Sequence, residues 1–471
     1  MKILLLSPYL SRKKTYSVFA GGAPILPPLG LAYLATALLN KGHEVEIVDS
    51  ILEELGGENL IKRIEKFNPD IVGITAVTNQ FLQAKKTIKL LKERNKNWIV
   101  ILGGPHISSM PKETMEECKD LDFGIYGEGE KTIIELLDYI NKKQNTPKLK
   151  KIRGVIFRGK NKIIINKPRE LEKDIDKFGF PARGLFRSIK DYSHSPFRGV
   201  GIMTSVMTSR GCPFNCYYCD HSVFGRAYRL NSPEHVINEL KMLKEKYGIN
   251  GVSFEDDNFA LDKKRTIEIC QGMLRERLNL KWSCELRVTS VDEEMISWMK
   301  KAGCWSVYFG IESGDPELLK FINKNQTLEQ VKKAVDICKK YKLKITGSFI
   351  LGLPKESKES IKRTINFASA LKVDGVTFHL FTPYPNTYLG RIASNYGKVQ
   401  GTWEDYAGHS GRVTFIPKGF TEKDLIEIQK KAYLTFALRL RYIFDNLNRF
   451  LDPNFIIKGT KSFFTILLKN E

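Results

Sequence analysis

The feature that most constrains the fold is a repeated alternation of short apolar segments with longer amphipathic ones. In the first part of the chain the apolar segments span residues 3–6, 44–49, 71–74, 98–102 and 123–126. Most of them lack the polar alternation of a half-exposed strand, and helix-like segments separate them. Such strands belong to a parallel sheet with helices on both faces. The sequence therefore predicts a doubly wound α/β domain over residues 1–145, whose ligands bind at the carboxyl ends of the strands.

A second series of six apolar segments follows further along the chain. These segments span residues 206–208, 251–254, 282–284, 306–309, 345–349 and 376–379. Six consecutive strand–helix units predict a closed or three-quarter (β/α) barrel over residues 201–400, with its working end at the carboxyl ends of the strands. We expect residues 146–200 to form a basic linker with a hairpin, and residues 401–471 to form a C-terminal helical region.

The composition is that of a folded protein with a strongly basic balance. The 471 residues include 75 Lys and Arg against 53 Asp and Glu, a formal charge of +22, and 42% are hydrophobic. No uncharged apolar run reaches the roughly 20 residues that cross a bilayer, and the N-terminal residues lack a signal-peptide pattern, so we expect a cytoplasmic protein. The densest cation run, residues 142–169, falls in the expected linker. Because no arginine-rich tract or zinc finger accompanies it, the charge indicates a lysine-biased surface rather than a nucleic-acid groove.

Three of the eight cysteines stand in one loop after a predicted strand, as Cys212-Pro-Phe-Asn-Cys216-Tyr-Tyr-Cys219. The other five are single residues on predicted helices and strands, where a free cysteine behaves as a small apolar side chain. Three thiolates at this C-x3-C-x2-C spacing suit a cubane iron–sulfur cluster that leaves one iron without a protein ligand. A three-cysteine zinc site with His221 as the fourth ligand is the alternative.

This loop, with the aromatic Tyr218 before its last cysteine, resembles the radical SAM superfamily, and the resemblance extends over residues 205–385. It implies a partial (β/α)6 barrel with a [4Fe-4S] cluster on Cys212, Cys216 and Cys219. In that family S-adenosylmethionine (SAM) binds the open iron through its amino and carboxylate groups. One electron then cleaves SAM to a 5′-deoxyadenosyl radical. The resemblance thus implies an external one-electron donor such as flavodoxin or ferredoxin.

The same resemblance implies contacts to SAM at the ends of the later barrel strands. The residues in question are Asp257, Arg287, Glu312, Ser313, Gly347 and Gly352. The aspartate would meet the amino group, although the sequence lacks the family's Gly-Gly-Glu, and the arginine suits a bidentate contact to the carboxylate. The Glu-Ser pair offers hydrogen bonds to ribose, and the glycine stretch resembles the backbone that holds adenine. Each also has a structural interpretation, such as helix capping by the aspartate.

A parallel α/β domain ahead of such a barrel resembles the cobalamin-binding class of the superfamily. The resemblance implies cobalamin contacts at Ser7, Gly103, Gly104, Gly127 and Glu128. Glycines at strand ends let the backbone approach a bulky planar ligand. The domain has no Asp-x-His-x-x-Gly motif, so we expect cobalamin to lack a histidine below cobalt. The one candidate, His106, ends a strand and is more typical of a loop histidine.

Further stretches at Pro181–Leu185 and Thr382–Thr387 resemble the subgroup that contains anaerobic magnesium-protoporphyrin ester cyclase, phosphonate-type C-methylases and hopanoid-modifying enzymes. The resemblance implies a radical SAM enzyme that, with cobalamin, methylates an unactivated carbon of a small-molecule or lipid substrate. A cobalamin-dependent cyclase or oxidoreductase is the nearest alternative. An RNA-modifying enzyme of the methylthiotransferase kind is disfavoured because Cys118 is the one cysteine before the cluster loop. The intact loop disfavours a non-catalytic metal-binding or scaffold protein.

Aromatic and basic residues crowd the C-terminal part, among them Tyr433, Phe436, Arg439 and Arg441. Such a helix either rests on an anionic membrane and meets a lipid substrate, or closes the barrel against the core. We expect the second arrangement, with peripheral membrane contact as the alternative.

Overall fold

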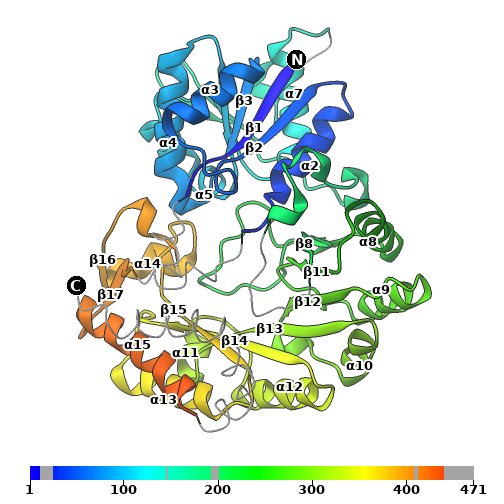
Figure 1. The fold of residues 1–471 in the computed structure, drawn as a ribbon. Helices are drawn as coiled ribbons and strands as arrows, with labels where there is room; N and C mark the ends of the chain where they lie inside the picture. The colour runs from blue at the N-terminus through cyan, green and yellow to red at the C-terminus, as the bar shows by residue number, and fades with distance from the viewer. Residues whose placement is uncertain (11–24, 145–146, 193–200, 408–411, 440–471) are drawn as a thin grey trace.

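Seven strands form the sheet of the N-terminal part, in the order β2-β1-β3-β4-β5-β6-β7. The structure is a computed structural model that describes residues 1–10, 25–144, 147–192, 201–407 and 412–439 (Figure 1). The strands are β1 (Lys2–Ser7), β2 (Glu44–Asp49), β3 (Ile71–Thr75), β4 (Ile99–Gly103), β5 (Phe123–Ile125), β6 (Val155–Arg158) and β7 (Ile163–Ile165). The helices are α2 (Leu29–Leu39), α3 (Gly57–Phe67), α4 (Phe81–Arg94), α5 (Pro105–Ser109), α6 (Pro111–Glu117) and α7 (Glu130–Ile140), with a 3-10 turn η2 (Thr78–Gln80). Strands β1 to β5 pair in parallel, which confirms the doubly wound prediction.

The expected hairpin lies against this sheet rather than apart from it. Strand β6 pairs antiparallel with β5, and β7 pairs antiparallel with β6. The side chain of Ile156 joins the apolar layer on one face of the sheet, and that of Val155 joins the layer on the other. The hairpin predicted within the basic linker therefore extends the N-terminal sheet. Its local sequence predicts the hairpin, but not the sheet edge on which the hairpin pairs.

The second sheet has six strands in chain order, from β8 to β15, all paired in parallel. The strands are β8 (Met203–Val206), β11 (Gly251–Phe254), β12 (Lys281–Leu286), β13 (Cys304–Glu312), β14 (Lys344–Leu351) and β15 (Gly375–Leu380). The helices are α8 (Pro233–Tyr247), α9 (Lys263–Arg275), α10 (Glu293–Lys301), α11 (Pro316–Phe321), α12 (Leu328–Lys340) and α13 (Lys358–Ala370). Within the described residues β8 and β15 remain the two edges, so the barrel is the open, partial form. The first strand begins three residues earlier than the sequence predicts.

Alternation along the barrel strands separates two sets of side chains. Trp282 and Phe349 belong to the set that packs against the helices, and both are fully buried. The hydroxyls of Ser253 and Ser283, on the other side of neighbouring strands, approach each other at 3.4 Å. Since successive residues of a strand point to opposite faces, the second set lines the inside of the barrel.

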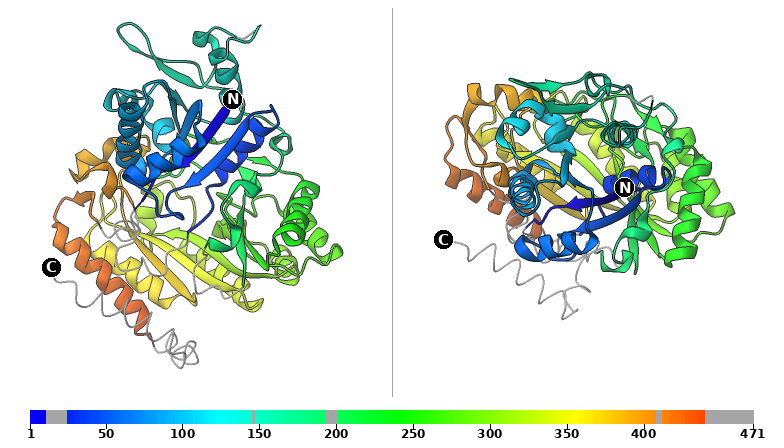
Figure 2. Two further views of the ribbon diagram at one scale, coloured as in Figure 1. Left: turned by 45° about the horizontal axis from the view of Figure 1, so that its top comes forward. Right: turned by 90° about the horizontal axis from the view of Figure 1, so that it is seen from above.

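The last described elements cover the barrel and reach the N-terminal domain. They are α14 (Tyr388–Tyr396), β16 (Gly397–Val399), the 3-10 turn η9 (Trp403–Asp405), β17 (Phe415–Pro417) and α15 (Glu422–Ala437). Helix α15 packs on α13 and β15 (Figure 2), and the Tyr433 hydroxyl accepts a hydrogen bond from Phe378 N–H at 3.0 Å. The Arg439 guanidinium donates to the carbonyls of Leu371 and Val373. Up to Arg439 the tail thus lies against the barrel, and Arg441 with the rest of the tail falls outside the described residues.

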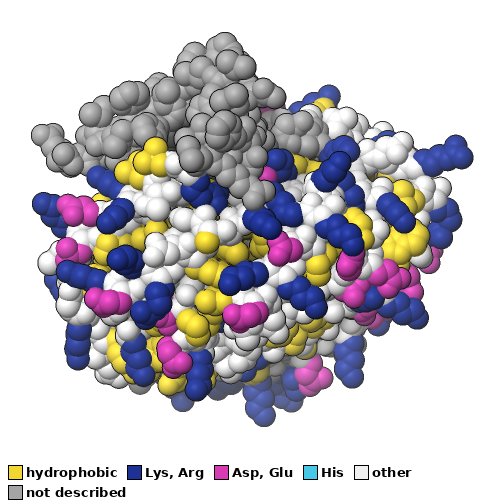
Figure 3. Space-filling view, turned by 90° about the horizontal axis from the view of Figure 1, so that it is seen from below, with side chains coloured by type: hydrophobic (Ala, Val, Ile, Leu, Met, Phe, Trp, Pro, Cys, Tyr) yellow, Lys and Arg dark blue, Asp and Glu magenta, His cyan; other side chains and the backbone are white. Residues whose placement is uncertain are grey.

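Charge and hydropathy over the surface are mixed. Figure 3 shows Lys and Arg side chains spread over one face of the molecule with Asp and Glu side chains between them. This distribution fits the predicted lysine-biased surface. In the part of the chain that the structure describes, no helix has the length and apolar character that a membrane crossing requires.

Candidate functional site

The three clustered cysteines lie in a loop between β9 (Ser209–Arg210) and β10 (Arg229–Leu230), which pair antiparallel. Neighbouring elements hold the loop by its backbone. Tyr217 N–H donates to the Ile322 carbonyl (3.0 Å), and the Tyr217 carbonyl accepts from Leu389 N–H (2.9 Å). Cys216 is buried, Cys212 is half-buried and Cys219 is exposed. The loop is therefore fixed from the barrel side, and Cys219 is its most exposed cysteine residue.

Gly211 is required by the backbone just before the first cysteine. Its φ is +84°, and a Cβ there would overlap the Ala227 carbonyl oxygen and stand 3.1 Å from the carbonyl oxygens of Phe224 and Gly225. Glycine adopts positive φ without steric cost, whereas other residues do not. The two arms of the loop can thus pass each other here because position 211 has no side chain.

Two cations stand beside the buried thiol. Arg287 follows β12, lies 3.8 Å from the centroid of the Phe214 ring, and donates to Cys216 Sγ at 3.3 Å. A hydrogen bond with Cys219 and the charges of Lys324 and Arg287 lower the pKa of the Cys216 thiol, against the effect of burial. The same hydrogen bond raises the pKa of the Cys219 thiol, so the charges of Lys324 and Arg287 are what favours the thiolate, the form that ligates metal.

Arg287 also contacts the chain beyond β13. A second guanidinium nitrogen donates to the carbonyl of Lys324, so two of its donors serve the cluster loop and its neighbour. Its Nε is buried and has no partner among the described residues.

Glu312 ends β13 and joins the same group of side chains. Its Oε1 accepts hydrogen bonds from the Tyr218 hydroxyl (2.9 Å) and from Lys324 Nζ (2.8 Å). The ion pair of Glu312 and Lys324 is buried: the Glu312 side chain is 8% exposed and the Lys324 side chain is 6% exposed. Glu312 therefore lies next to the cluster loop, held by Tyr218 and Lys324, and its contact to SAM stays a prediction. The position of Lys324 is not signalled by any motif in the sequence.

The acidic stretch after β11 divides into two roles. Asp256 is buried and accepts from Thr208 N–H (2.8 Å) and from the Ser209 hydroxyl (2.5 Å). It thereby fixes the chain as it leaves β8 toward the cluster loop, and burial raises its pKa to about 6. Asp257 is exposed, and its charge raises the pKa of the Cys212 thiol as a secondary effect after burial. The predicted residue thus faces the cysteine loop.

The remaining predicted SAM residues have structural partners. The Ser313 hydroxyl is buried against Thr364 Oγ1 at 3.1 Å. Gly347 lies within β14 on the side that faces the helices, where a Cβ would stand 2.9 Å from Ile311 Cδ1. It therefore serves core packing and does not face the inside of the barrel. Gly352 follows β14, and its N–H donates to the buried carboxyl of Glu356. Burial raises the pKa of Glu356 to about 8.

The carboxyl ends of β1, β4 and β5, where the sequence predicts cobalamin, consist of backbone and small side chains. Ser7 ends β1, and its carbonyl accepts from Ser50 N–H at 3.0 Å. The Ser50 hydroxyl is buried with no partner among the described residues. Gly103 ends β4, where a Cβ would meet only the Ile125 carbonyl oxygen, 3.8 Å away. At Gly127, after β5, the nearest atom to a Cβ is the Val223 carbonyl oxygen at 3.9 Å. Open strand ends and an unpaired hydroxyl fit a large ligand with polar groups.

Two of the predicted cobalamin residues serve the protein itself. Gly104 has φ +94°, and a Cβ there would stand 2.6 Å from Thr75 Oγ1, so the turn between β4 and α5 requires glycine. Both carboxylate oxygens of Glu128 are bound by the guanidinium groups of Arg210 and Arg229. Glu128 thus joins the two domains by ion pairs, and its contact to cobalamin stays a prediction.

His106 is enclosed by aromatic rings. Its ring stacks on Phe81 with centroids 4.0 Å apart and meets the edge of Trp403 at 5.4 Å. Burial lowers its pKa to about 4, and Nδ1 is buried without a partner among the described residues. The other described histidine of this domain, His43, lies before the amino end of β2, whereas His106 follows the carboxyl end of β4.

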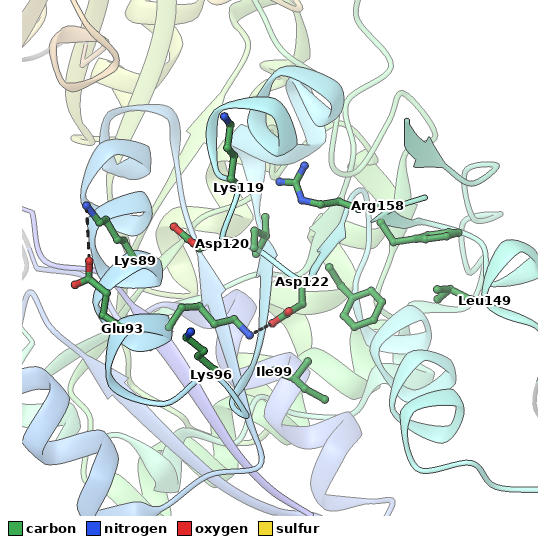
Figure 4. Close-up of a pocket in the computed structure, with 13 residues that line it drawn as sticks. Lys89, Glu93, Lys96, Ile99, Lys119, Asp120, Asp122, Leu149 and Arg158 are labelled. Carbon is green, nitrogen blue, oxygen red and sulfur yellow. Dashed lines mark ion pairs between the residues drawn. The ribbon is translucent and has the colours of Figure 1, made fainter. Parts of the chain in front are cut away.

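A groove of about 650 Å³ lies at the amino ends of the parallel strands, beside the starts of β4 and β5 (Figure 4). Several of its cations have partners, because Lys89 pairs with Glu93 and Lys92 pairs with Asp122 at 2.6 Å. The groove is therefore separate from the cysteine loop and from the glycine-rich strand ends.

The cysteine loop was compatible with zinc or with a cluster on sequence grounds. Among the residues that the structure describes, no three His, Cys, Asp or Glu side chains are grouped closely enough to hold a single metal ion. A cubane cluster binds each thiolate through a different iron, and a loop with three spaced thiols and nearby cations fits that requirement.

Comparison with known proteins agrees with this arrangement. The Radical SAM superfamily model matches residues 206–368, and the B12 binding domain model matches residues 18–137. The chain is 39% identical over 464 residues to an uncharacterized methyltransferase of Pyrococcus horikoshii, covering 97% of this chain and 96% of that protein. It is 28% identical over 429 residues to the anaerobic magnesium-protoporphyrin IX monomethyl ester cyclase of Cereibacter sphaeroides, covering 89% and 69%.

Among solved structures, the cobalamin-dependent S-adenosylmethionine radical enzyme OxsB has a TM-score of 0.76 at 18% identity, over 99% of this chain and 72% of that chain. This likeness shows the fold. The two family matches confirm the predicted cofactors, a [4Fe-4S] cluster, SAM and cobalamin, at the level of the family. The chain belongs to the radical SAM enzymes that carry an N-terminal B12-binding domain.

Proposed function

We propose that this protein is a cobalamin-dependent radical SAM enzyme that methylates an unactivated carbon of a small molecule. The observation that carries the proposal is the loop with Cys212, Cys216 and Cys219, which lies where the barrel meets the B12-binding domain. When bound, the cluster supplies an electron to SAM and cobalamin supplies a methyl group. The Pyrococcus horikoshii relative is named a methyltransferase, and the similarity to it covers nearly the whole length of both chains. This similarity supports a methyltransferase activity.

The chain's own residues would hold the cluster and prepare its ligands. The three thiols are the ligands, and the cations of Arg287 and Lys324 stabilise the charged form of Cys216. The same two cations lie over aromatic rings of the loop, Arg287 over Phe214 at 3.8 Å and Lys324 over Tyr218 at 5.8 Å from the ring centroids. Charged hydrogen bonds strengthen in such a low-dielectric environment.

SAM would bind between the cluster loop and the inside of the barrel. Asp257 faces the loop and is suited to the amino group, and Glu312 lies beside Tyr218. The backbone turn at Gly352, fixed by Glu356, is suited to the adenine because its conformation is held by two hydrogen bonds. The carboxylate of SAM would need a donor, and the unpaired Nε of Arg287 supplies one.

The substrate would occupy the inside of the barrel, below the B12-binding domain. Polar side chains line it: the Tyr308 hydroxyl lies 2.8 Å from Thr377 Oγ1, and His379 Nε2 lies 3.2 Å from the same atom. Glu285, on β12, has an exposed side chain on the same face of the sheet. Burial raises the pKa of Tyr308 to about 12, so it remains a hydrogen-bond donor at neutral pH. These groups favour a small substrate with hydrogen-bonding groups.

The external one-electron donor, such as flavodoxin or ferredoxin, would approach the exposed Cys219 side of the loop. We also propose a cytoplasmic location. Contact of residues 440–471 with an anionic membrane is a separate proposal, which co-sedimentation with anionic vesicles at low salt would test.

A second candidate function, cyclisation, rests on the likeness to the magnesium-protoporphyrin ester cyclase. The test is anaerobic reconstitution with iron, sulfide and hydroxocobalamin, followed by methyl-labelled SAM and dithionite. Methylation predicts 5′-deoxyadenosine together with label on cobalamin. Deoxyadenosine without label on cobalamin favours the cyclase, and neither product contradicts both functions. Cys216→Ala should abolish deoxyadenosine, and Cys338→Ala, which removes a buried thiol outside the loop, should retain it.

A further inference from the structure

Four buried charged side chains cross the boundary between the two domains. Glu128 and Glu130 come from the B12-binding domain, and Arg210 and Arg229 come from the two strands that flank the cysteine loop. Arg210 Nη1 lies 3.0 Å from Glu128 Oε1, and its Nη2 lies 2.7 Å from Glu130 Oε1. Arg229 binds both oxygens of Glu128, each at 2.9 Å. Their side chains are between 3% and 9% exposed.

The positions of these residues connect the two cofactor regions. Glu128 follows β5 by way of Gly127, at the open strand end predicted for cobalamin, and Glu130 begins α7. Arg210 stands two residues before Cys212, with Gly211 between them. The path from the cobalamin edge to the first cluster ligand therefore consists of one ion pair and two peptide bonds.

The positive and negative charges of this network balance only when the two domains are in contact. Arg210 and Arg229 are directly opposite each other on paired strands, where like charges repel. The two glutamates neutralise them and come from the other domain. Three aromatic rings enclose Arg210, with its guanidinium carbon 4.2 Å from the centroid of Phe178, 5.0 Å from Tyr33 and 5.4 Å from Phe224. A buried charge that loses its partner is strongly unfavourable, so the contact defines one relative position of the loop and the strand end.

We propose that Arg210 and Glu128 are positioning residues that set the separation of the cluster and cobalamin. This inference rests on the proposed function. It assigns to the network a role in transferring the methyl group of SAM to cobalt, whereas the cleavage of SAM takes place at the cluster and does not require a set distance to cobalamin. The bidentate geometry matters, because one guanidinium must contact two carboxylates at once.

The test compares Glu128→Gln and Arg210→Lys with Glu135→Gln in the reconstituted full-length enzyme. Glu135 binds Arg169 through both oxygens, at 2.9 and 2.6 Å, and contacts neither strand of the cysteine loop, so it controls for loss of an arginine pair. The first readout is the effect of the reduced cluster on the relaxation of the cob(II)alamin EPR signal, which reports their separation. The second is the rate of methyl transfer from labelled SAM to cob(I)alamin, which leaves S-adenosylhomocysteine, relative to the rate of deoxyadenosine formation.

We expect both network variants to weaken the EPR interaction and to lower the ratio of the two rates, on the order of 10²-fold for a shift of about 1 Å. Lysine should not replace arginine, since it cannot bridge both carboxylates. Unchanged EPR interaction and ratio in cofactor-loaded variants would overturn the proposal. If these variants do not load cofactors, Glu130→Gln, which removes one contact, is measured instead. Failure of all three to load assigns the network to folding and also overturns the positioning role. A wild-type enzyme without cobalamin would refute the proposed function instead.

Discussion

Replacing Gly211 by alanine tests whether the backbone before Cys212 sets the cluster geometry. The residue has φ +84°, a conformation that costs other residues roughly 1–2 kcal/mol. The added Cβ would also overlap the Ala227 carbonyl oxygen, so the two arms of the loop must separate by about 1 Å to reach ordinary contact. Overpacking of this kind costs about 1–3 kcal/mol. We therefore expect a total loss of about 2–5 kcal/mol in the free energy of unfolding.

The effect on the cluster should exceed the effect on stability, because the displaced backbone carries the first ligand. Displacements near 1 Å reduce reaction rates by on the order of 10²-fold. The assay measures deoxyadenosine formed from SAM and dithionite, with iron content and urea unfolding in parallel. Gly225→Ala is the control, since Gly225 has φ +66° in the same loop but its Cβ would meet only Leu171 Cδ1, at 3.4 Å. It should lose about 1–2 kcal/mol and keep most of its activity. Wild-type iron content and rate in Gly211→Ala, or equal losses in both variants, would refute the reasoning.

Three further predictions concern the ligands, the pH dependence and the linker. Cys216→Ala should remove deoxyadenosine formation and lower the iron content, measured by product analysis and iron assay, whereas retained SAM cleavage would exclude Cys216 as a ligand. The pKa of Glu356 rises from 4.5 to about 8 in the folded state, so the folded state keeps a proton that the unfolded state has released. Stability should then fall as pH rises from about 4.5 to 8, by up to about 1.4 kcal/mol per pH unit, and Glu356→Gln should remove this slope in urea titrations. Arg183 and Glu239 form an ion pair whose side chains are 0% and 2% exposed, so Arg183→Leu should cost about 3–5 kcal/mol in urea unfolding, and a loss under 1 kcal/mol would contradict the pairing.

The sequence predicts the architecture because the fold follows from local patterns. Uninterrupted apolar strands such as Ile71–Thr75, separated by amphipathic helices, leave few options other than a parallel sheet with both faces covered. Several barrel helices begin at a side-chain cap, as at Ser232, Asp262 and Thr327, and these caps are also local signals. The local sequence predicts the hairpin of β6 and β7 but not its pairing with β5, because that pairing is a long-range contact.

The candidate site is predictable where spacing alone carries the chemistry. Three cysteines within eight residues are such a case, and the structure holds them in one loop. The place of Arg287 and Ser313 after a strand predicts contacts to SAM, and it does not indicate their contacts with Cys216 and Thr364. Position along the chain does not show which neighbours take up the donors of a side chain.

The sequence shows some residues of the arginine and glutamate network but not their pairing. The run Gly127-Glu128-Gly129-Glu130 and the Arg210 before Gly211 both appear in the sequence, yet neither indicates the other. Arg229 has no surrounding motif at all. Partners separated by 80 to 101 residues become recognisable when the two domains are seen in contact.

The most direct test of the central claim is the fate of the SAM methyl group in the anaerobically reconstituted enzyme. The chain should bind cobalt and about four irons, as one cubane cluster requires. With methyl-labelled SAM and a reductant it should form 5′-deoxyadenosine and place the label on cobalamin. A protein that binds the cluster but retains no cobalt and leaves the label on SAM would contradict a cobalamin-dependent methylase.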